Sequence, residues 1–369
     1  MTRLVDVRPF SIEVRLDTRP PNTPQVGRNL MKQNHAEPAG RKPKRSFELL
    51  IGLSLTALCL YLALRGIDPR EVLDSLARAS YSGVPLYLAF LFTYFWLKAI
   101  RWRLLLLPLG EFQTSAVASP LMIGFMGNNI LPARMGEIIR VFLFSRRFSL
   151  PAAAVLSTVV LERLLDTLVV LLFLVIGAVM VGGLPAWIHY SAWVVGTLTL
   201  ALTALVAALT IASDFLSGMA HRVVVKLPRR LSDWLPSVIQ STAQALRCLR
   251  SPRLVAAVVA ISVVKWSLMA GMVYVSLRSL SLELPPWAPF LVVGICALGV
   301  AIPSAPGFFG VIQIGFWVSL QLFGVSKADA FASSVFYHLG QYIPVTFAGL
   351  YYLNRQRISL GDIRRVGAR

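Results

Sequence analysis

Long apolar runs constrain this chain more than any other feature of its sequence. A bilayer core about 30 Å thick needs roughly 20 apolar residues in a helix that rises 1.5 Å per residue. Five runs meet this length: residues 47–64, 81–100, 152–181, 186–212 and 254–276. A sixth run, 330–353, is interrupted by polar residues and a proline. The sequence therefore predicts an all-α integral membrane protein with about six spanning helices.

The composition excludes two other classes. Hydrophobic residues make up 56% of the chain and charged residues only 14%, well below the quarter that is typical of soluble proteins. The net charge of +19 would suit a nucleic-acid-binding protein, but too little polar sequence is present to build a soluble basic surface. We therefore expect the membrane and no nucleic acid as a partner, with the basic residues concentrated in cytoplasmic loops.

Two apolar stretches do not fit the spanning pattern. The stretch 115–144 contains a Gly-Asn-Asn segment, Pro132 and Gly136, and the stretch 287–324 contains prolines and glycines at its middle. Each half of the second stretch is too short to cross a bilayer. Broken segments survive at membrane depth when they are buried in protein or line a wet cavity. We interpret both stretches as re-entrant helical hairpins, with kinked spanning helices as the alternative.

Lys and Arg counts predict the topology. Residues 1–46 and 354–369 are basic tails, the first of them disordered, and both are expected in the cytoplasm together with the loop 213–253. Met31 precedes a compact basic stretch, so initiation there is a hypothesis that intact-mass measurement would test. The segment 65–80 is expected outside, as a short surface helix with one apolar face formed by Val72, Leu73, Leu76 and Ala77. This pattern fits a bacterial inner-membrane protein.

The two broken stretches share a pattern that indicates an internal repeat. Pro132 and Gly136 form P-x-x-x-G, and Pro306 and Gly310 form the same pattern about 174 residues later. In each case a helix with buried polar residues follows. Three predicted spans separate the two units, which would therefore have opposite orientations. The membrane domain 47–353 is thus expected to contain inverted halves around 110–181 and 285–353.

Charged residues inside the run 152–181 are the strongest candidates for a site. A charge near the bilayer centre costs roughly 2.5 to 3.5 kcal/mol, so Glu162, Arg163 and Asp166 should face the interior. Glu162 and Asp166 lie four residues apart and would repel each other unless a cation lay between them. Two interpretations are open. The cluster could lock the hairpin to this helix, or Arg134, Arg140 and Arg163 could clamp a phosphate while Glu137 and both carboxylates balance their charge.

Other intramembrane polar residues are candidates for the same site. The Asn128 and Asn129 side chains and the backbone around Pro132 and Gly136 could bind a head group, although Asn129 is better explained as a helix cap. Lys265 is expected to face a cavity rather than to snorkel to the membrane surface. Neither cofactor-binding nor metal-binding spacing is visible, so none is expected. The remaining candidates for substrate binding are Ser304, Pro306, Gly307, Gly310, Gln313, His338 and Gln341.

The segment 124–140, GFMGNNILPARMGEIIR, resembles the signature of the lysylphosphatidylglycerol synthase transmembrane-region family, whose members are also described as flippase-like domains. Residues 161–166 are similar to that family's "ER…D" helix, and residues 303–310 to its second proline–glycine loop. Gln313 replaces a glutamate that is common there. The resemblance covers about 47–353. It implies a membrane domain involved in moving lipids between leaflets. Lysyl transfer is not expected, because no soluble aminoacyl-transferase domain is visible.

These observations predict binding and translocation of an anionic phospholipid or of a polyprenyl-phosphate-linked substrate. Two alternatives remain open. The protein could be a membrane-embedded transferase whose base is Glu137 or Glu162, or a non-transporting accessory subunit that works with enzymes of lipid or envelope-glycan biosynthesis. The sequence does not indicate an oligomeric state.

Overall fold

A computed structural model describes residues 64–131, 134–181, 251–301 and 306–357, together with scattered residues between 54 and 62 and between 186 and 204. The predicted runs 47–64 and 186–212, the loop 213–253 and both tails therefore lie wholly or mostly outside the described residues. The site residues Pro132 and Ser304 also lie outside them. The tracts described contain the whole of both predicted hairpins apart from their turns.

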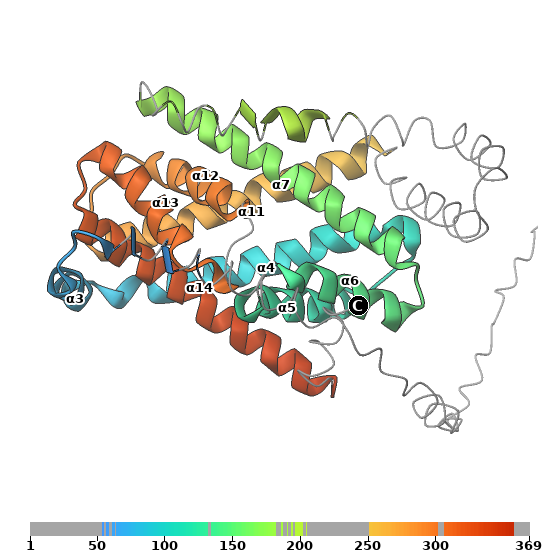
Figure 1. The fold of residues 1–369 in the computed structure, drawn as a ribbon. Coiled ribbons are helices and arrows are strands. Elements are labelled where there is room, and N and C mark those ends of the chain that lie inside the picture. The colour runs from blue at the N-terminus through green and yellow to red at the C-terminus, as the bar shows by residue number, and fades with distance from the viewer. Residues whose placement is uncertain are drawn as a thin grey trace, which may run out of the picture. The chain divides into compact units, whose positions relative to one another are not determined.

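The described tracts are helical and contain no β-strand (Figure 1). Apolar side chains dominate most of the helices, and polar residues or glycines mark most of their ends. The short 3-10 segments are η1 (Tyr81–Gly83), η2 (Leu107–Leu109), η4 (Pro306–Phe308) and η5 (Gln321–Phe323). The helices are α3 (Pro69–Arg78), α4 (Val84–Leu106), α5 (Thr114–Ile130), α6 (Met135–Phe148), α7 (Ala152–Val181), α11 (Pro252–Ser279), α12 (Ala288–Ala301), α13 (Val311–Leu320) and α14 (Lys327–Arg355).

Within the described tracts, three helices are long and apolar enough to cross a membrane: Tyr81–Leu109, Ala152–Val181 and Pro252–Ser279. They coincide with three of the predicted runs. The sixth run, 330–353, lies within α14, a 29-residue helix that holds several polar side chains and Pro344. The membrane character of the chain is thus clear, while the count of about six spans stays a prediction.

The first broken stretch is a hairpin of two helices, α5 and α6, which pack side by side. Gly136 lies so close to α5 that a Cβ on it would come within 1.8 Å of the Gly124 carbonyl oxygen. Arg134, which precedes α6, has a left-handed backbone with φ of 54°. The chain therefore folds back at this point, and that the hairpin is re-entrant stays a prediction.

The second broken stretch has the same architecture. Helices α12 and α13 pack against each other, with Gly315 close to Cys296. Phe308 has φ of 61° and occupies the position of this hairpin that Arg134 occupies in the first, two residues after the proline. A left-handed conformation is uncommon for residues other than glycine. The two P-x-x-x-G segments thus share a backbone feature as well as a sequence pattern.

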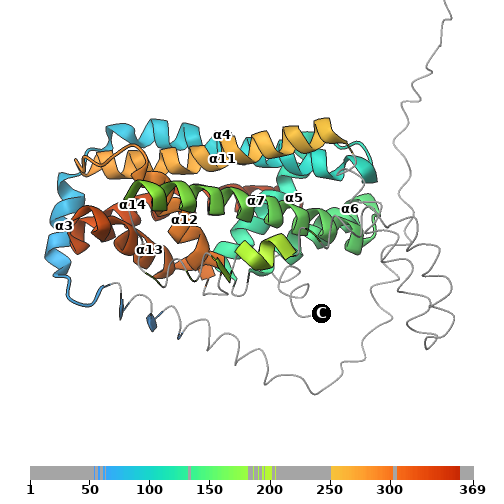
Figure 2. The same ribbon diagram turned by 90° about the horizontal axis from the view of Figure 1, so that it is seen from above.

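Helix pairing is reciprocal between the two parts of the chain. Helices α4 and α11 pack antiparallel, with Gly83 against Val275 and Gly271 against Phe90 (Figure 2). Helix α5 packs on α14, which follows the second hairpin, and α12 packs on α7, which follows the first. Each hairpin is therefore held by the long helix that follows the other one.

Helix α3 packs on the start of α14. The Ser75 hydroxyl donates to Asp329 Oδ1 at 2.8 Å, and Val72 is buried in a cluster with Ala328. Leu73 is 64% exposed, whereas Ser75 is buried, because its hydrogen-bond partner on α14 compensates the burial of its hydroxyl group. That this helix lies on the membrane surface with one apolar face stays a prediction.

Candidate functional site: a buried ion cluster beside a cavity

Glu162 lies near the middle of α7 and is completely buried. Its Oε1 is 2.8 Å from Lys98 Nζ and 3.3 Å from Arg101 Nη2, and its Oε2 is 3.1 Å from Arg140 Nη2. The Arg140 guanidinium also lies 4.7 Å from the centre of the Trp102 ring. One carboxylate therefore joins cations from α4 and α6, and these contacts fix the first hairpin against α4 and α7.

Asp166, one turn further along α7, forms a second centre of the cluster. Arg101 donates to both of its oxygens, at 2.5 and 3.0 Å, and so binds it bidentately. Lys265 Nζ and Trp266 Nε1, both on α11, donate to Asp166 Oδ1 at 2.8 and 2.9 Å. Arg101 contacts Glu162 as well, and is therefore the cation that the spacing of the two carboxylates requires.

This cluster carries more positive than negative charge. Lys98, Arg101, Arg140 and Lys265 are four cations, and Glu162 and Asp166 are two carboxylates, which leaves a surplus of two positive charges. All six side chains are buried. Arg140 has two nitrogen atoms, Nε and Nη1, without a hydrogen-bond partner among the described residues. The cluster thus produces a positive potential in a region of low dielectric constant.

A third carboxylate lies in more open surroundings. Glu137 Oε1, in the first turn of α6, is 2.9 Å from Arg163 Nη2 on α7. Their side chains are 23% and 33% exposed, whereas those of Glu162 and Asp166 are 0% and 6% exposed. Arg163 is not paired with its helical neighbour Asp166, whose oxygens bind Arg101 and Lys265.

Arg134 connects the two hairpins. Its Nη2 donates to the backbone carbonyl of Val300, near the end of α12, and its guanidinium lies 5.6 Å from the centre of the Phe308 ring. The last carbonyls of a helix have no partner within the helix, so this arginine satisfies one of them. The breaks of both hairpins therefore meet at Arg134.

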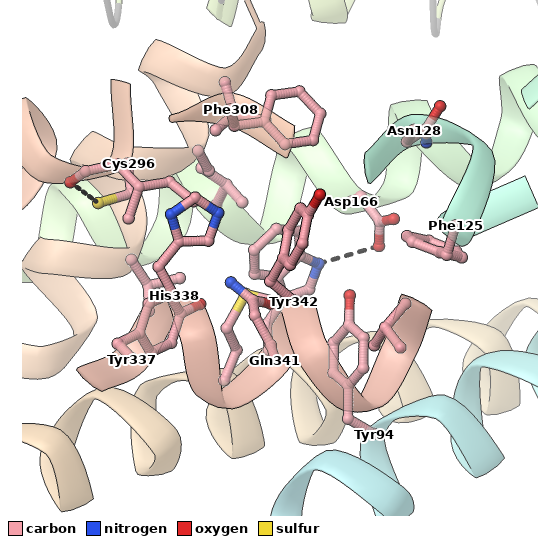
Figure 3. Close-up of a pocket in the computed structure, with 18 of the residues that line it drawn as sticks. Tyr94, Phe125, Asn128, Asp166, Cys296, Phe308, Tyr337, His338, Gln341 and Tyr342 are labelled. Carbon is pink, nitrogen blue, oxygen red and sulfur yellow. Dashed lines mark hydrogen bonds between the residues drawn. The ribbon is translucent and has the colours of Figure 1, made fainter. Parts of the chain in front are cut away.

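A cavity of about 250 Å³ lies between the helices at this meeting point (Figure 3). Its charged wall contains Arg134, Glu137, Arg163 and Asp166, from α6 and α7 and the residue before α6. The opposite wall is uncharged and aromatic, and Figure 3 shows the Tyr342 ring and the His338 imidazole there, on α14. Trp266 contributes from α11. The cavity therefore combines a polar wall with an apolar lining, as ligand pockets in proteins usually do.

The second hairpin is held to α14 through uncharged groups. His338 Nε2 is 2.7 Å from the Gly307 carbonyl oxygen, and His338 Nδ1 is 3.2 Å from Gln313 Nε2. Gln313 Oε1 accepts from the Gly310 backbone at 2.6 Å. These bonds satisfy backbone groups at the break of the helix, so Gln313 and Gly310 act in the scaffold. His338, Gln341 and Gly307 line the cavity.

The two asparagines have different roles. Asn128 Oδ1 accepts from the Gly136 N–H at 2.9 Å, which caps the start of α6 across the turn. Asn129 Nδ2 donates to Thr346 Oγ1 at 2.9 Å and so connects α5 to α14. The prediction that Asn129 is the cap was wrong, because its side chain points to α14 and its neighbour Asn128 faces α6. Both asparagines line the cavity.

Comparison with known proteins agrees with this architecture. Residues 49–349 match the family described as "Lysylphosphatidylglycerol synthase TM region", and the match includes both hairpins. The chain belongs to this family. The chain is also similar to a protein named "Glycosyltransferase AglD" from Haloferax volcanii, with 27% identity over 325 residues. This similarity covers 80% of the chain but 52% of the relative, so the chain spans about half the length of that curated protein.

In this member of the lysylphosphatidylglycerol synthase TM-region family, most predicted site residues do meet. Arg134 and Arg163 line the cavity, but Arg140 does not and is bound to Glu162 behind it. Of the three arginines predicted to clamp a phosphate, Arg140 is therefore the one that does not reach the cavity. Lys265 was expected to face the cavity, but it is buried behind the lining, where it binds Asp166, a residue that does line the cavity. Pro306 belongs to the helical turn η4 before Gly307, and nothing further is described for it.

Sequence reasoning did not identify Lys98 and Arg101 as site residues. Both side chains are at most 1% exposed and bind the α7 carboxylates. Their spacing of three residues at the end of an apolar run places them on one helical face, which was the available signal. Tyr94, one turn before Lys98, lines the cavity and was also missed.

Proposed function

We propose that this protein binds the anionic head group of a membrane lipid in the cavity and carries it between leaflets, for lipid or glycan biosynthesis. The lipid is an anionic phospholipid or a polyprenyl-phosphate-linked substrate. The name of the matched family supports the lipid assignment, and the name of the Haloferax relative supports a connection to glycan synthesis. The proposed location is a bacterial inner membrane, with both termini in the cytoplasm.

The observation that carries this proposal is the surplus of cations around the cavity. The buried cluster has two unbalanced positive charges, and adding Arg134, Arg163 and Glu137 brings the surplus to three. Fixed cations in a region of low dielectric constant attract an anion strongly. Guanidinium groups bind phosphate oxygens bidentately, and two of them line the cavity. A phosphate is therefore the ligand that this wall fits best.

We further propose that α4–α7 and α11–α14 are inverted repeats and that both hairpins are re-entrant. The antiparallel contact of α4 with α11 supports this, because a two-fold axis that exchanges two antiparallel neighbours reverses the direction of each half. In transporters with such repeats the binding site lies between the halves, near the bilayer midplane. Single cysteines at Asn128 and Ser304 should react with reagents from opposite sides of the membrane. Labelling from the same side would contradict the inversion.

Transport is tested with the purified full chain in liposomes that contain fluorescent phosphatidylglycerol or a fluorescent polyprenyl phosphate. Quenching from outside with dithionite measures how much lipid changes leaflet. We expect transfer with the wild type and strongly reduced transfer with Arg163→Gln, while Arg278→Gln, which removes an exposed arginine with a carboxylate partner, should behave as the wild type. Equal rates in wild-type and empty liposomes would refute transport.

The same liposomes separate transport from the two alternatives. A membrane-embedded transferase would convert the lipid chemically, which mass spectrometry would detect without any change of leaflet. Glu162 is completely enclosed by cations and does not line the cavity, so of the two carboxylates predicted as the base, Glu137 is the one with access to it. An accessory subunit would give neither conversion nor transfer.

A further inference from the structure

The three carboxylates of the site differ in what a ligand could do to them. Glu162 and Asp166 are buried, and each binds at least two cations in the cluster. Glu137 is partly exposed, lines the cavity, and has one ion-pair partner among the described residues, Arg163. A ligand that enters the cavity therefore meets two carboxylates, Glu137, which can be displaced, and Asp166, which is fixed.

The two arginines of the charged wall are both occupied by groups of the protein itself. Arg163 is bound to Glu137, and Arg134 to the Val300 carbonyl. Each retains a buried Nε without a hydrogen-bond partner among the described side chains. A phosphate between them could accept from these nitrogens and replace both protein oxygens, since guanidinium presents several donors in one plane.

We propose that Glu137 is a specificity-determining residue, which occupies Arg163 in the empty cavity and must be displaced by the phosphate of the ligand. This inference rests on the proposed function, because it takes the ligand to be a lipid phosphate. A zwitterionic head group carries its own cation and gains less from a freed arginine. Glu137 thus competes with the ligand for Arg163 and weakens the binding of every ligand. It selects those ligands whose net negative charge is attracted to Arg163 strongly enough to displace its carboxylate.

The size of the effect follows from the exposure of the pair. Partly exposed ion pairs contribute only modestly to stability. The apparent affinity for the ligand is proportional to the fraction of the protein in which Arg163 is free of Glu137. Glu137→Gln keeps the shape of the side chain and removes its charge. We expect it to tighten binding of an anionic lipid about fivefold, which corresponds to about 1 kcal/mol.

The test measures binding of dihexanoyl phosphatidylglycerol, farnesyl phosphate and dihexanoyl phosphatidylcholine to the full chain in detergent, by isothermal titration calorimetry. The first two probes distinguish a phospholipid from a polyprenyl phosphate as the source of the phosphate. The third is the zwitterionic reference. The matched control is Glu283→Gln, which removes an exposed carboxylate that also pairs with one arginine, Arg278, at 3.3 Å. This control should leave all three affinities unchanged.

A double-mutant cycle assigns the gain to Arg163. Glu137→Gln should tighten binding of an anionic probe in the wild-type background and have no effect in the Arg163→Gln background. An equal gain in both backgrounds, or no gain in the wild type, would overturn the role of Glu137. If neither anionic probe binds the wild type, the proposed function itself is wrong. If Arg163→Gln weakens binding but Glu137→Gln changes nothing, only the inference about Glu137 fails.

Discussion

The surplus of cations in the buried cluster predicts that losing an anion destabilises the protein more than losing a cation. Asp166→Asn is the decisive substitution, because it keeps the shape of the side chain and removes one of two carboxylates. Asp166 accepts from Arg101, Lys265 and Trp266. Without its charge, the surplus in the cluster rises from two to three, and Lys265 has no anion within 4 Å among the described residues.

Removing one partner of a buried ion pair costs about 3 to 5 kcal/mol, because the other charge remains buried without compensation. We expect Asp166→Asn to cost this much in free energy of unfolding. Lys265→Met removes a cation of similar length and lowers the surplus to one. Asp166 keeps its two bonds from Arg101, so we expect a cost of at most about 2 kcal/mol.

Unfolding in mixed detergent–SDS micelles, followed by tryptophan fluorescence, measures both variants on the same scale. Glu283→Gln, at an exposed position, is the reference for a charge change without burial and should lie within about 0.5 kcal/mol of the wild type. If Lys265→Met lowers the free energy of unfolding by as much as Asp166→Asn, or by more, the argument is refuted. The stability of the cluster would then depend on its cations at least as much as on its carboxylates.

Two further substitutions test the first hairpin by the same unfolding measurement. Gly136→Ala should lower the free energy of unfolding by more than about 3 kcal/mol, because a Cβ would lie 1.8 Å from the Gly124 carbonyl oxygen and the backbone cannot yield without separating α5 from α6. A loss below about 1 kcal/mol would show that the two helices do not approach so closely. Asn128→Ala should cost about 1 to 2 kcal/mol by removing the acceptor of the Gly136 N–H, and Asn128→Asp should recover most of this loss as an alternative cap. Equal losses for Ala and Asp would contradict the capping role.

The sequence predicted the positions of the breaks well, because their cause is local. Proline and glycine weaken a helix locally, so the pattern of Pro132 and Gly136 indicated the first break, and the same pattern around Pro306 indicated the second. Helix α6 begins at Met135, directly after this break. The depth of the hairpins in the membrane depends on the bilayer, which helix geometry alone does not specify.

The pairing of charges was harder to predict, because it depends on the tertiary arrangement. Arg163 lies three residues before Asp166 on α7, yet Glu137 pairs with Arg163 from α6 and Arg101 pairs with Asp166 from α4. Positive charges at the end of an apolar run fit a cytoplasmic loop as well as a buried cluster. Which interpretation holds for Lys98 depends on whether a carboxylate from another helix lies opposite it, and Glu162 does.

The contact between Lys265 and Asp166 has a consequence for the order in which the chain is made. Asp166 already has Arg101 as a counter-ion, from a helix synthesised before it. Lys265 lies at 0% exposure in a helix that emerges about 100 residues later, and its counter-ion belongs to the earlier part of the chain. A lone lysine enters a membrane at substantial cost. We therefore expect α11 to insert stably only after the first half has placed Asp166 where Lys265 can bind it. Biogenesis of this protein therefore has a direction, from the half that supplies both buried carboxylates to the half whose lysine depends on one of them.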